Sequence, residues 1–263
     1  MKALFDLTPG DSPLLISIPH AGTDLPADIA ARLTPEARGL SDTDWHVPRL
    51  YDFAGGMGAT LLVARLSRYA IDLNRPPDGA SLYPGAATTG LCPTESFDGV
   101  PLYAPGQEPD SEEIAIRTER FHAPYHRALA DTVDDIRQRF GYVLLYDAHS
   151  IRSSVPRLFD GELPGFNIGT NGGASAASGL SEAVESVCRM ADDYSTVVNG
   201  RFRGGYITRH YGDPARHIHA IQMELGQKIY MTEAPPWAFD DAAAARLRPV
   251  LIQVVQAMRD WAG

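Results

Sequence analysis

Short apolar runs recur along the chain and alternate with longer segments in which apolar residues are spaced three or four apart. Continuous apolar runs of about four to eight residues are typical of strands that are buried on both faces of a sheet. The strands predicted in this way are Leu14–Ile18 (LLISI), Thr60–Arg65 (TLLVAR), Tyr69–Leu73, Tyr142–Tyr146 (YVLLY), Phe166–Gly169, Thr196–Val198 and Ala220–Leu225 (AIQMEL).

The segments with helical spacing predict amphipathic helices between these strands. The longest, Asp110–Phe140, begins with the capping residue Ser111, and Pro124 is expected to kink it. The other predicted helices are Pro26–Arg38, Val47–Met57, Ala174–Ala191 and Asp240–Ala262. Strands that alternate with helices predict one α/β domain over residues 1–263, with a mostly parallel or mixed central sheet covered by helices on both faces.

Composition and charge exclude several classes of protein. A net charge of −10 argues against a nucleic-acid-binding face. The two cysteines allow neither a disulfide framework nor a Cys-rich zinc site, which favours a reducing, cytoplasmic location. The polar N-terminus does not resemble a signal peptide, and no apolar run approaches the ~20 residues of a membrane span. The sequence does not specify an oligomeric state.

Polar residues follow two of the predicted strands directly. His20 comes just after the run LLISI, and Asp147-Ala148-His149-Ser150 follows the run YVLLY. In open α/β sheets, functional residues gather at the carboxyl ends of the strands. A single histidine in such a place is usually structural, whereas two histidines at the same kind of edge indicate a metal site.

Two histidines and one carboxylate would form a three-ligand site with an open fourth position, which is the pattern of catalytic zinc. Asp44 is the favoured carboxylate, although Asp42 and Asp44 are also well placed to cap a helix. Asp24, Asp42 and Asp147 remain alternatives, and Asp147 is better placed as an outer partner of a ligand. Zn²⁺ is the favoured ion, and Co²⁺, Ni²⁺ or Fe²⁺ would accept the same ligands.

Further candidates lie elsewhere on this edge. Glu224 stands in an apolar strand, where burial would raise its pKa as a general base requires. Arg75 is followed by two prolines and is a rigid mount for binding an anion. The basic, Gly-rich segment Asn199–Arg216 suggests capture of a small anion, and a solvated loop explains it equally well. His122 and His126 have metal-pair spacing, yet core or surface roles are favoured, with His126 a possible outer partner of the site.

Taken together, these pieces resemble the N-formylglutamate amidohydrolase family. The matching segments are SIPHAG, DTDWHVPRLYD, IDLNRP, YDAHSIRS, GFNIGTNGG, NGRFRGGYITRHYG and IQMELGQKIYMTE, which extend from about Leu14 to Glu233. That family is related to zinc carboxypeptidases and aspartoacylases, so the resemblance implies a phosphorylase/hydrolase-like α/β fold. The HxxE motif of carboxypeptidases is absent because Thr23 stands three positions after His20. The acidic ligand must therefore come from farther along the chain.

The resemblance also implies a reaction, the hydrolysis of N-formyl-L-glutamate to formate and L-glutamate, which is the last step of one route of histidine degradation. The partner would be a small dicarboxylate amide. The implied roles are metal binding by His20, Asp44 and His149, general acid–base catalysis by Glu224, carbonyl polarisation by Arg68, and substrate binding by Asn74 and Arg75. Arg152, Arg203 and Arg209 are also expected to bind the substrate, because its two carboxylates suit arginine-rich loops.

Three alternative functions are compatible with the same residues. The site could act on another N-acyl amino acid or on a peptide C-terminus, since the sequence does not give the size of the pocket. The protein could be a non-catalytic binder of small anions or amino acids, although a glutamate buried beside two histidines would then serve no purpose. It could also be a phosphorylase-type enzyme that needs no metal.

Overall fold

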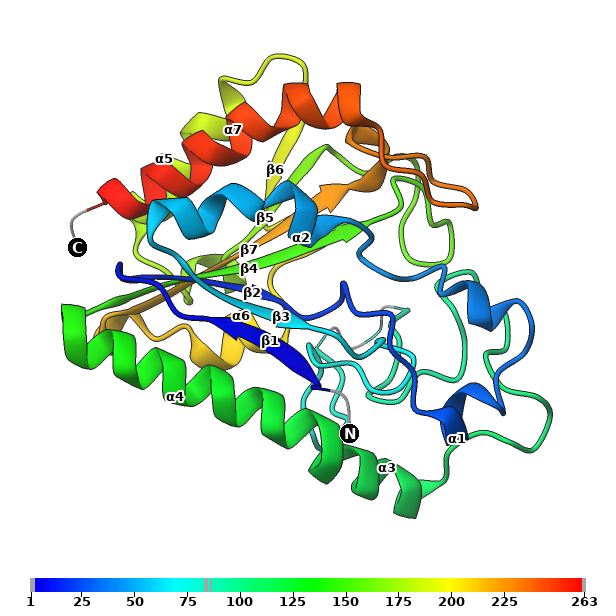
Figure 1. The fold of residues 1–263 in the computed structure, drawn as a ribbon. Helices are drawn as coiled ribbons and strands as arrows, with labels where there is room; N and C mark the ends of the chain where they lie inside the picture. The colour runs from blue at the N-terminus through cyan, green and yellow to red at the C-terminus, as the bar shows by residue number, and fades with distance from the viewer. Residues whose placement is uncertain (1–2, 83–84, 86, 262–263) are drawn as a thin grey trace.

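The computed structural model describes residues 3–82, 85 and 87–261. Its strands form one seven-stranded sheet in the order β1-β3-β2-β4-β7-β5-β6 (Figure 1). Neighbouring strands are parallel except β1, which runs antiparallel to β3, and β5, which runs antiparallel to β7. The strands are β1 (Phe5–Thr8), β2 (Leu14–Ile18), β3 (Thr60–Ala64), β4 (Val143–Ile151), β5 (Phe166–Gly169), β6 (Thr196–Val198) and β7 (Ile218–Gly226).

Helices cover both faces of this sheet, as Figure 1 shows. One face carries α3 (Ser111–Arg117), α4 (Ala123–Phe140) and the short α6 (Tyr206–Tyr211). The other carries α2 (Val47–Leu50), α5 (Ser178–Arg189) and α7 (Asp241–Asp260), while α1 (Ala27–Ala30) lies beside the sheet. The predicted α/β fold with a mixed sheet and helices on both faces is therefore confirmed.

Short stretches of other helix types connect these elements. They are the 3₁₀ turns η1 (Ala37–Gly39), η2 (Asp52–Met57), η4 (Asn171–Gly173), η5 (Pro214–Arg216) and η6 (Gln227–Ile229), and the π-helical turn η3 (Thr118–His122). The π turn joins α3 to α4 directly before Pro124. Because proline has no backbone N–H, the regular hydrogen-bond ladder is interrupted at this point, where a kink was predicted.

The sheet is buried because its central strands are apolar on both faces. All residues of β2, β4, β5 and β7 are buried, as the continuous apolar runs predicted. In β2, Leu14 and Ile16 pack toward the α5–α7 side, whereas Leu15 packs toward α4. Each fully buried Leu or Ile contributes about 1.5–3 kcal/mol relative to an exposed one. These two layers hold the carboxyl ends of β2, β4 and β7 in fixed positions.

Several predicted elements differ in the structure. Tyr69–Leu73, predicted as a strand, is a buried turn region, because a tightly packed turn has the same apolar composition as a short strand. The strand β1 was not predicted, since only Phe5 of its four residues is partly buried and the others are exposed. Asn199–Arg216, predicted as a loop, contains α6.

The predicted helices also change at their ends. Pro26–Arg38 and Val47–Met57 are each divided into a short α-helix and a 3₁₀ turn. Asp110, rather than Ser111, caps α3 by accepting a hydrogen bond from the Glu113 amide. The predicted end of the last helix at residue 262 lies outside the described residues. Among those that are described, no helix is both long and apolar enough to span a bilayer.

Candidate metal centre and active site

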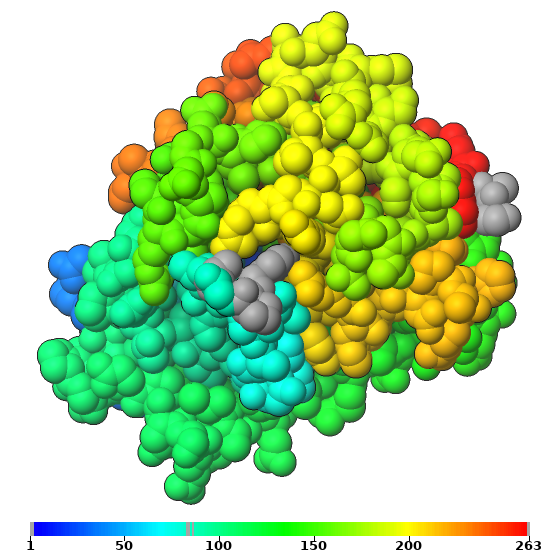
Figure 2. All heavy atoms as spheres, turned by 180° about the vertical axis from the view of Figure 1, so that it is seen from behind, coloured from blue at the N-terminus to red at the C-terminus, as the bar shows by residue number. Residues whose placement is uncertain are grey.

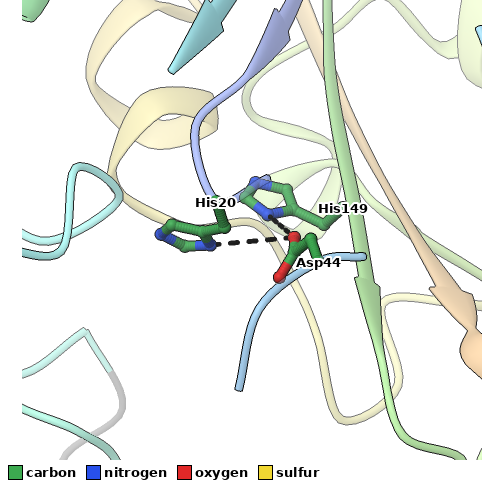
Figure 3. A group of neighbouring side chains, drawn as sticks. All are labelled: His20, Asp44 and His149. Carbon is green, nitrogen blue, oxygen red and sulfur yellow. Dashed lines mark hydrogen bonds and ion pairs between the residues drawn. The ribbon is translucent and has the colours of Figure 1, made fainter. Parts of the chain in front are cut away.

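Three side chains from distant parts of the chain meet at the carboxyl edge of the sheet (Figure 3). His20 lies two residues beyond β2, His149 lies near the end of β4, and Asp44 precedes α2. All three are buried, and one ligand atom from each lies within 4.8 Å of the others. Two hydrogen bonds hold Asp44 in this position. The Asp44 amide donates to His20 O at 3.0 Å, and Asp44 Oδ2 accepts from the Ser150 amide at 3.1 Å.

Both imidazoles direct the same ring nitrogen toward the carboxylate. Nδ1 of His149 lies 3.0 Å from Asp44 Oδ2, and Nδ1 of His20 lies 3.8 Å from the same oxygen. Two ligand atoms of a tetrahedral zinc ion, each roughly 2.0–2.1 Å from the metal, are about 3.3 Å apart. The three donors therefore fit a divalent metal in both kind and spacing.

The outer nitrogen of each ring is held by a further carboxylate. Nε2 of His20 lies 2.7 Å from Asp72 Oδ1, and Nε2 of His149 lies 3.1 Å from Asp147 Oδ2. Carboxylates that accept the outer N–H of a histidine fix its tautomer and leave the other nitrogen available to a metal. This pairing is the arrangement expected around a metal-binding histidine, and it assigns Asp147 to an outer position rather than to the ligand set.

Charge in the metal-free protein is divided unevenly between the two histidines. Burial, together with the neighbouring Arg68 guanidinium, lowers the pKa of His20. Burial alone would also lower the pKa of His149, but Asp147 and Asp44 raise it well above the usual value. Because a histidine must be deprotonated to bind a metal ion, metal binding here would release a proton from His149.

Glu224 lies beside this trio on the neighbouring strand. It is paired in register with His149 across the parallel strands β4 and β7, and its side chain is 7% exposed. Its Oε2 accepts a hydrogen bond from Gln222 Nε2 at 3.3 Å. Burial raises the pKa of Glu224 to about 8. A buried carboxyl group with such a pKa can exchange a proton near neutral pH, as a general base and acid must.

Arg68 is buried against the same cluster. Its Nη2 donates to Asp72 Oδ2 at 2.7 Å, its Nη1 lies 3.6 Å from Asp44 Oδ1, and its guanidinium lies 4.7 Å from the centre of the Phe97 ring. Asp72 thus joins His20 to Arg68, one through each carboxylate oxygen. The Arg68 guanidinium therefore places a fixed positive charge beside the candidate metal ligands.

Asn74 and Arg75 follow Asp72 in a short connecting segment. Asn74 Nδ2 lies 3.2 Å from Asp147 Oδ2 and 2.9 Å from His149 Nε2. Arg75 donates from Nε to Thr89 O at 3.0 Å and from Nη1 to its neighbour's carbonyl at 3.1 Å. These bonds hold the Arg75 guanidinium in one orientation, with part of its surface exposed.

One cavity joins these residues, and its volume is about 60 Å³. It is lined by His20, Asp44 and His149, by Glu224, Gln222, Arg68, Asn74 and Arg75, and by a wall formed from Ala87–Thr89, Leu158, Arg201 and Phe202. Figure 2 shows a hollow at this place, between the cyan segment that follows residue 75, the green segment near residue 158 and the yellow segment near residue 201.

The structure does not bring every predicted residue to this cavity. Arg152, Arg203 and Arg209 do not line it in the described part of the chain. Arg152 pairs with Asp98 Oδ2 at 2.7 Å, and Arg209 donates from Nε to Gly204 O at 2.7 Å. Arg152 and Arg209 are directed elsewhere, because Arg152 lies in the loop after β4 and Arg209 lies in α6, and composition specifies neither conformation.

The competing carboxylates have other partners. Asp42 Oδ2 accepts a hydrogen bond from the Phe97 amide at 2.8 Å, and Asp24 Oδ2 lies 3.5 Å from Arg65 Nε. The suggested capping role of Asp42 and Asp44 is wrong, since His46 occupies the N-cap of α2.

Some residues of the site were missed from the sequence. Asp72 was not recognised, although an acidic residue inside the apolar segment before Asn74 is a signal for a buried functional carboxylate. Arg201 was seen only as part of a basic loop, yet it lines the cavity, donating from Nε to Leu158 O at 2.8 Å and from Nη2 to Ala87 O at 3.0 Å. Neither position carries spacing that links it to the histidines.

Fold and site together define the class of this protein. It is an α/β protein with a mixed sheet, and a buried His–Asp–His trio with a neighbouring glutamate lies at the carboxyl edge of that sheet. The donor atoms of the trio suit a divalent metal. The sequence model of the N-formylglutamate amidohydrolase family matches residues 12–231. The chain belongs to this family.

Relatives of known name agree with this assignment. The chain is 50% identical over 261 residues to the N-formylglutamate deformylase of Pseudomonas aeruginosa, covering 99% of this chain and 98% of the relative. It is 51% identical over 261 residues to the N-formylglutamate deformylase of Pseudomonas putida, covering 99% and 97%. The crystal structure of N-formylglutamate amidohydrolase from Ralstonia eutropha JMP134 superposes with a TM-score of 0.83 at 28% identity over 97% of both chains.

Proposed function

We propose that this protein is a metal-dependent amidohydrolase that cleaves N-formyl-L-glutamate to formate and L-glutamate. The observation that carries the proposal is the position of Glu224, buried in the same cavity as His20, Asp44 and His149. The names of the two Pseudomonas relatives, each about half identical over nearly the whole chain, support the substrate.

The ligand set favours zinc, and cobalt, nickel or iron(II) would accept the same donors. His20 and His149 would bind the ion through Nδ1 and Asp44 through its carboxylate, while Asp72 and Asp147 hold the outer ring nitrogens. When bound, the metal polarises the formyl carbonyl and lowers the pKa of water. The sheet edge supplies these donors already oriented, so little rearrangement is needed on binding.

Glu224 moves the protons of the reaction. It accepts a proton from the attacking water as the new C–O bond forms, and it delivers that proton to the glutamate nitrogen as the C–N bond breaks. With its pKa raised to about 8, the buried carboxyl group keeps an ionised fraction at neutral pH that can accept the proton, and once protonated it holds that proton until the nitrogen takes it. Arg68, fixed between Asp72 and Asp44, would stabilise the negative charge that develops on the formyl oxygen.

The two carboxylates of the substrate require two cationic partners. Arg75 is proposed to bind one of them together with Asn74, because guanidinium groups pair with carboxylates in a bidentate manner. Arg201, on the opposite wall, is proposed to bind the other in place of Arg152, Arg203 and Arg209. Two free, buried cysteines accord with a cytoplasmic enzyme of histidine degradation.

The test is direct. Purified protein loaded with Zn²⁺ is incubated with N-formyl-L-glutamate, and formate and L-glutamate are measured together. N-acetyl- and N-succinyl-L-glutamate are compared at the same concentration. We expect equal amounts of both products from the formyl compound and much slower cleavage of the others. Faster cleavage of a larger acyl group would make this an acylase of different specificity, and unchanged substrate would indicate a binding protein. Full activity after exhaustive chelation would refute the metal requirement.

A further inference from the structure

The segment of residues 73–75, which carries two of the proposed substrate-binding side chains, is held by its backbone in an unusual way. Each of its three consecutive carbonyl oxygens accepts a hydrogen bond from a different residue of the α3–α4 helical unit or of α6. The bonds are His126 Nε2 to Leu73 O at 2.8 Å, the Tyr206 amide to Asn74 O at 3.3 Å, and His122 Nε2 to Arg75 O at 2.9 Å.

The close approach of α6 depends on a glycine. A Cβ atom built at Gly205 would lie 2.4 Å from Asn74 Nδ2, so no larger residue fits there without displacing the asparagine. Asn74 Oδ1 in turn accepts the amide of Ile207 at 2.7 Å. The first turn of α6 and the segment 73–75 are therefore packed as one unit.

The two histidines have a defined tautomer and charge. A carbonyl oxygen can only accept a hydrogen bond, so His122 and His126 must each carry a proton on Nε2. Nδ1 of His126 lies 3.0 Å from the Tyr211 hydroxyl. Burial lowers both pKa values, that of His126 to about 3, so both rings are neutral at neutral pH. Neutral rings can stack, and their centres are 4.1 Å apart at an angle of 26°.

These histidines are not part of the site itself. Neither of them lines the cavity in the described part of the chain, and both come from the helical unit that covers the sheet, at and just after the π turn η3. Single π-helical turns are frequent near functional sites, where they redirect side chains. The HxxxH spacing that might suggest a metal pair serves here to grip two carbonyls of one segment.

We propose that His122 and His126 are positioning residues, which hold segment 73–75 so that the Arg75 guanidinium meets a substrate carboxylate. The inference rests on the proposed function, because it assigns Arg75 to the substrate. Each histidine supplies one neutral hydrogen bond, and the loss of one such bond changes an equilibrium by about 5- to 10-fold. The effect is expected on substrate affinity, since neither ring contacts the reacting atoms.

The experiment compares His122→Leu with His122→Gln in the metal-loaded, full-length enzyme. We expect the leucine variant to raise KM for N-formyl-L-glutamate about 5- to 10-fold while kcat stays within about 2-fold. The glutamine variant, which keeps a donor near the position of Nε2, should restore most of the affinity. Thr118→Val is the matched control, because the Thr118 hydroxyl bonds Ile114 O within the same helical unit. It should leave both constants unchanged.

Hydrogen exchange provides a readout that does not depend on activity. Amides of residues 73–75 should exchange faster in the leucine variant than in the wild type or the glutamine variant, whereas exchange elsewhere and the thermal unfolding temperature should be the same in all three proteins. Unchanged exchange in this segment would overturn the proposal, as would faster exchange with an unchanged KM. Failure of the wild type itself to release formate would instead refute the proposed function, and the exchange measurement would still decide whether the histidines hold the segment.

Discussion

Replacing Glu224 by glutamine tests the proposed mechanism most directly. The substitution keeps the size and shape of a side chain that is 7% exposed, and it removes the ability to carry a proton. Positioned general acids and bases contribute about 10²- to 10⁴-fold to rate. We therefore expect kcat to fall at least about 100-fold. Metal content should be unchanged, because Glu224 is not part of the trio formed by His20, Asp44 and His149.

The same substitution should have a measurable effect on stability in the chelated protein. Burial raises the pKa of Glu224 from 4.5 to about 8, so between these pH values the folded chain keeps a proton that the unfolded chain has released. Wild-type stability therefore falls as the pH rises through this range, by up to about 5 kcal/mol. Glutamine does not ionise. Metal-free Glu224→Gln should unfold at a higher temperature than the wild type above pH 8, and the difference should shrink toward pH 4.5.

The assay combines formate release, elemental analysis and thermal unfolding at several pH values. Glu185→Gln is a suitable control, because this glutamate lies on α5 and pairs with Arg189 rather than with the site. Undiminished turnover in Glu224→Gln would remove Glu224 from the chemistry. Loss of metal from that variant would show that Glu224 is a ligand, and equal stability of both metal-free proteins at high pH would contradict its burial as an acid.

Three further predictions concern the support of the site and of the fold. Asp72→Asn should weaken metal affinity at least about 10-fold in a titration against a metal-binding dye, because His20 loses its charged outer partner. Arg75→Met should raise KM for N-formyl-L-glutamate about 100-fold or more in steady-state kinetics, with a smaller change in kcat. Glu113→Gln should lower the free energy of unfolding by about 2 kcal/mol at pH 7 in urea titrations, because it leaves the buried Arg117 without its carboxylate. Hydrogen bonding to Arg32 lowers the pKa of Glu113 to about 2, so this difference should persist above pH 4.5 and disappear as the pH falls through 2. An unchanged affinity, KM or pH profile would contradict the respective prediction.

The sequence predicted most of the central sheet and the two histidines of the candidate site because these rest on strong local signals. The run Tyr142–Tyr146 predicted the first part of β4, which continues past that predicted end to Ile151 and so includes His149. Glu224 lies in the predicted strand Ala220–Leu225, within β7, and parallel strands place their carboxyl ends at one edge. His20 was found by the same reasoning. Asp44 lies in a loop, and it was found only because a carboxylate was required near a helix start on the same edge.

What could not be predicted lies in segments whose conformation depends on tertiary contacts. The turn region 69–73 is as apolar as a strand, so periodicity could not reveal that Asp72 turns inward to hold His20 and Arg68. The arginines of the loops could not be ranked, because a long side chain in an irregular segment can point in several directions. Arg201 faces the cavity through bonds to backbone oxygens of two distant segments, whereas Arg152 pairs with Asp98.

Asn74 has a consequence for anyone who wishes to redesign this enzyme. It contacts Asp147 and His149 with its amide nitrogen and the first turn of α6 with its oxygen, while the next residue faces the ligand pocket. Alterations made here to accept a new acyl amino acid would at the same time disturb His149, one of the candidate metal ligands. The opposite wall, formed by Leu158, Arg201 and Phe202, is tied to backbone oxygens of residues 87 and 158. Libraries aimed at new specificity should therefore begin with that wall.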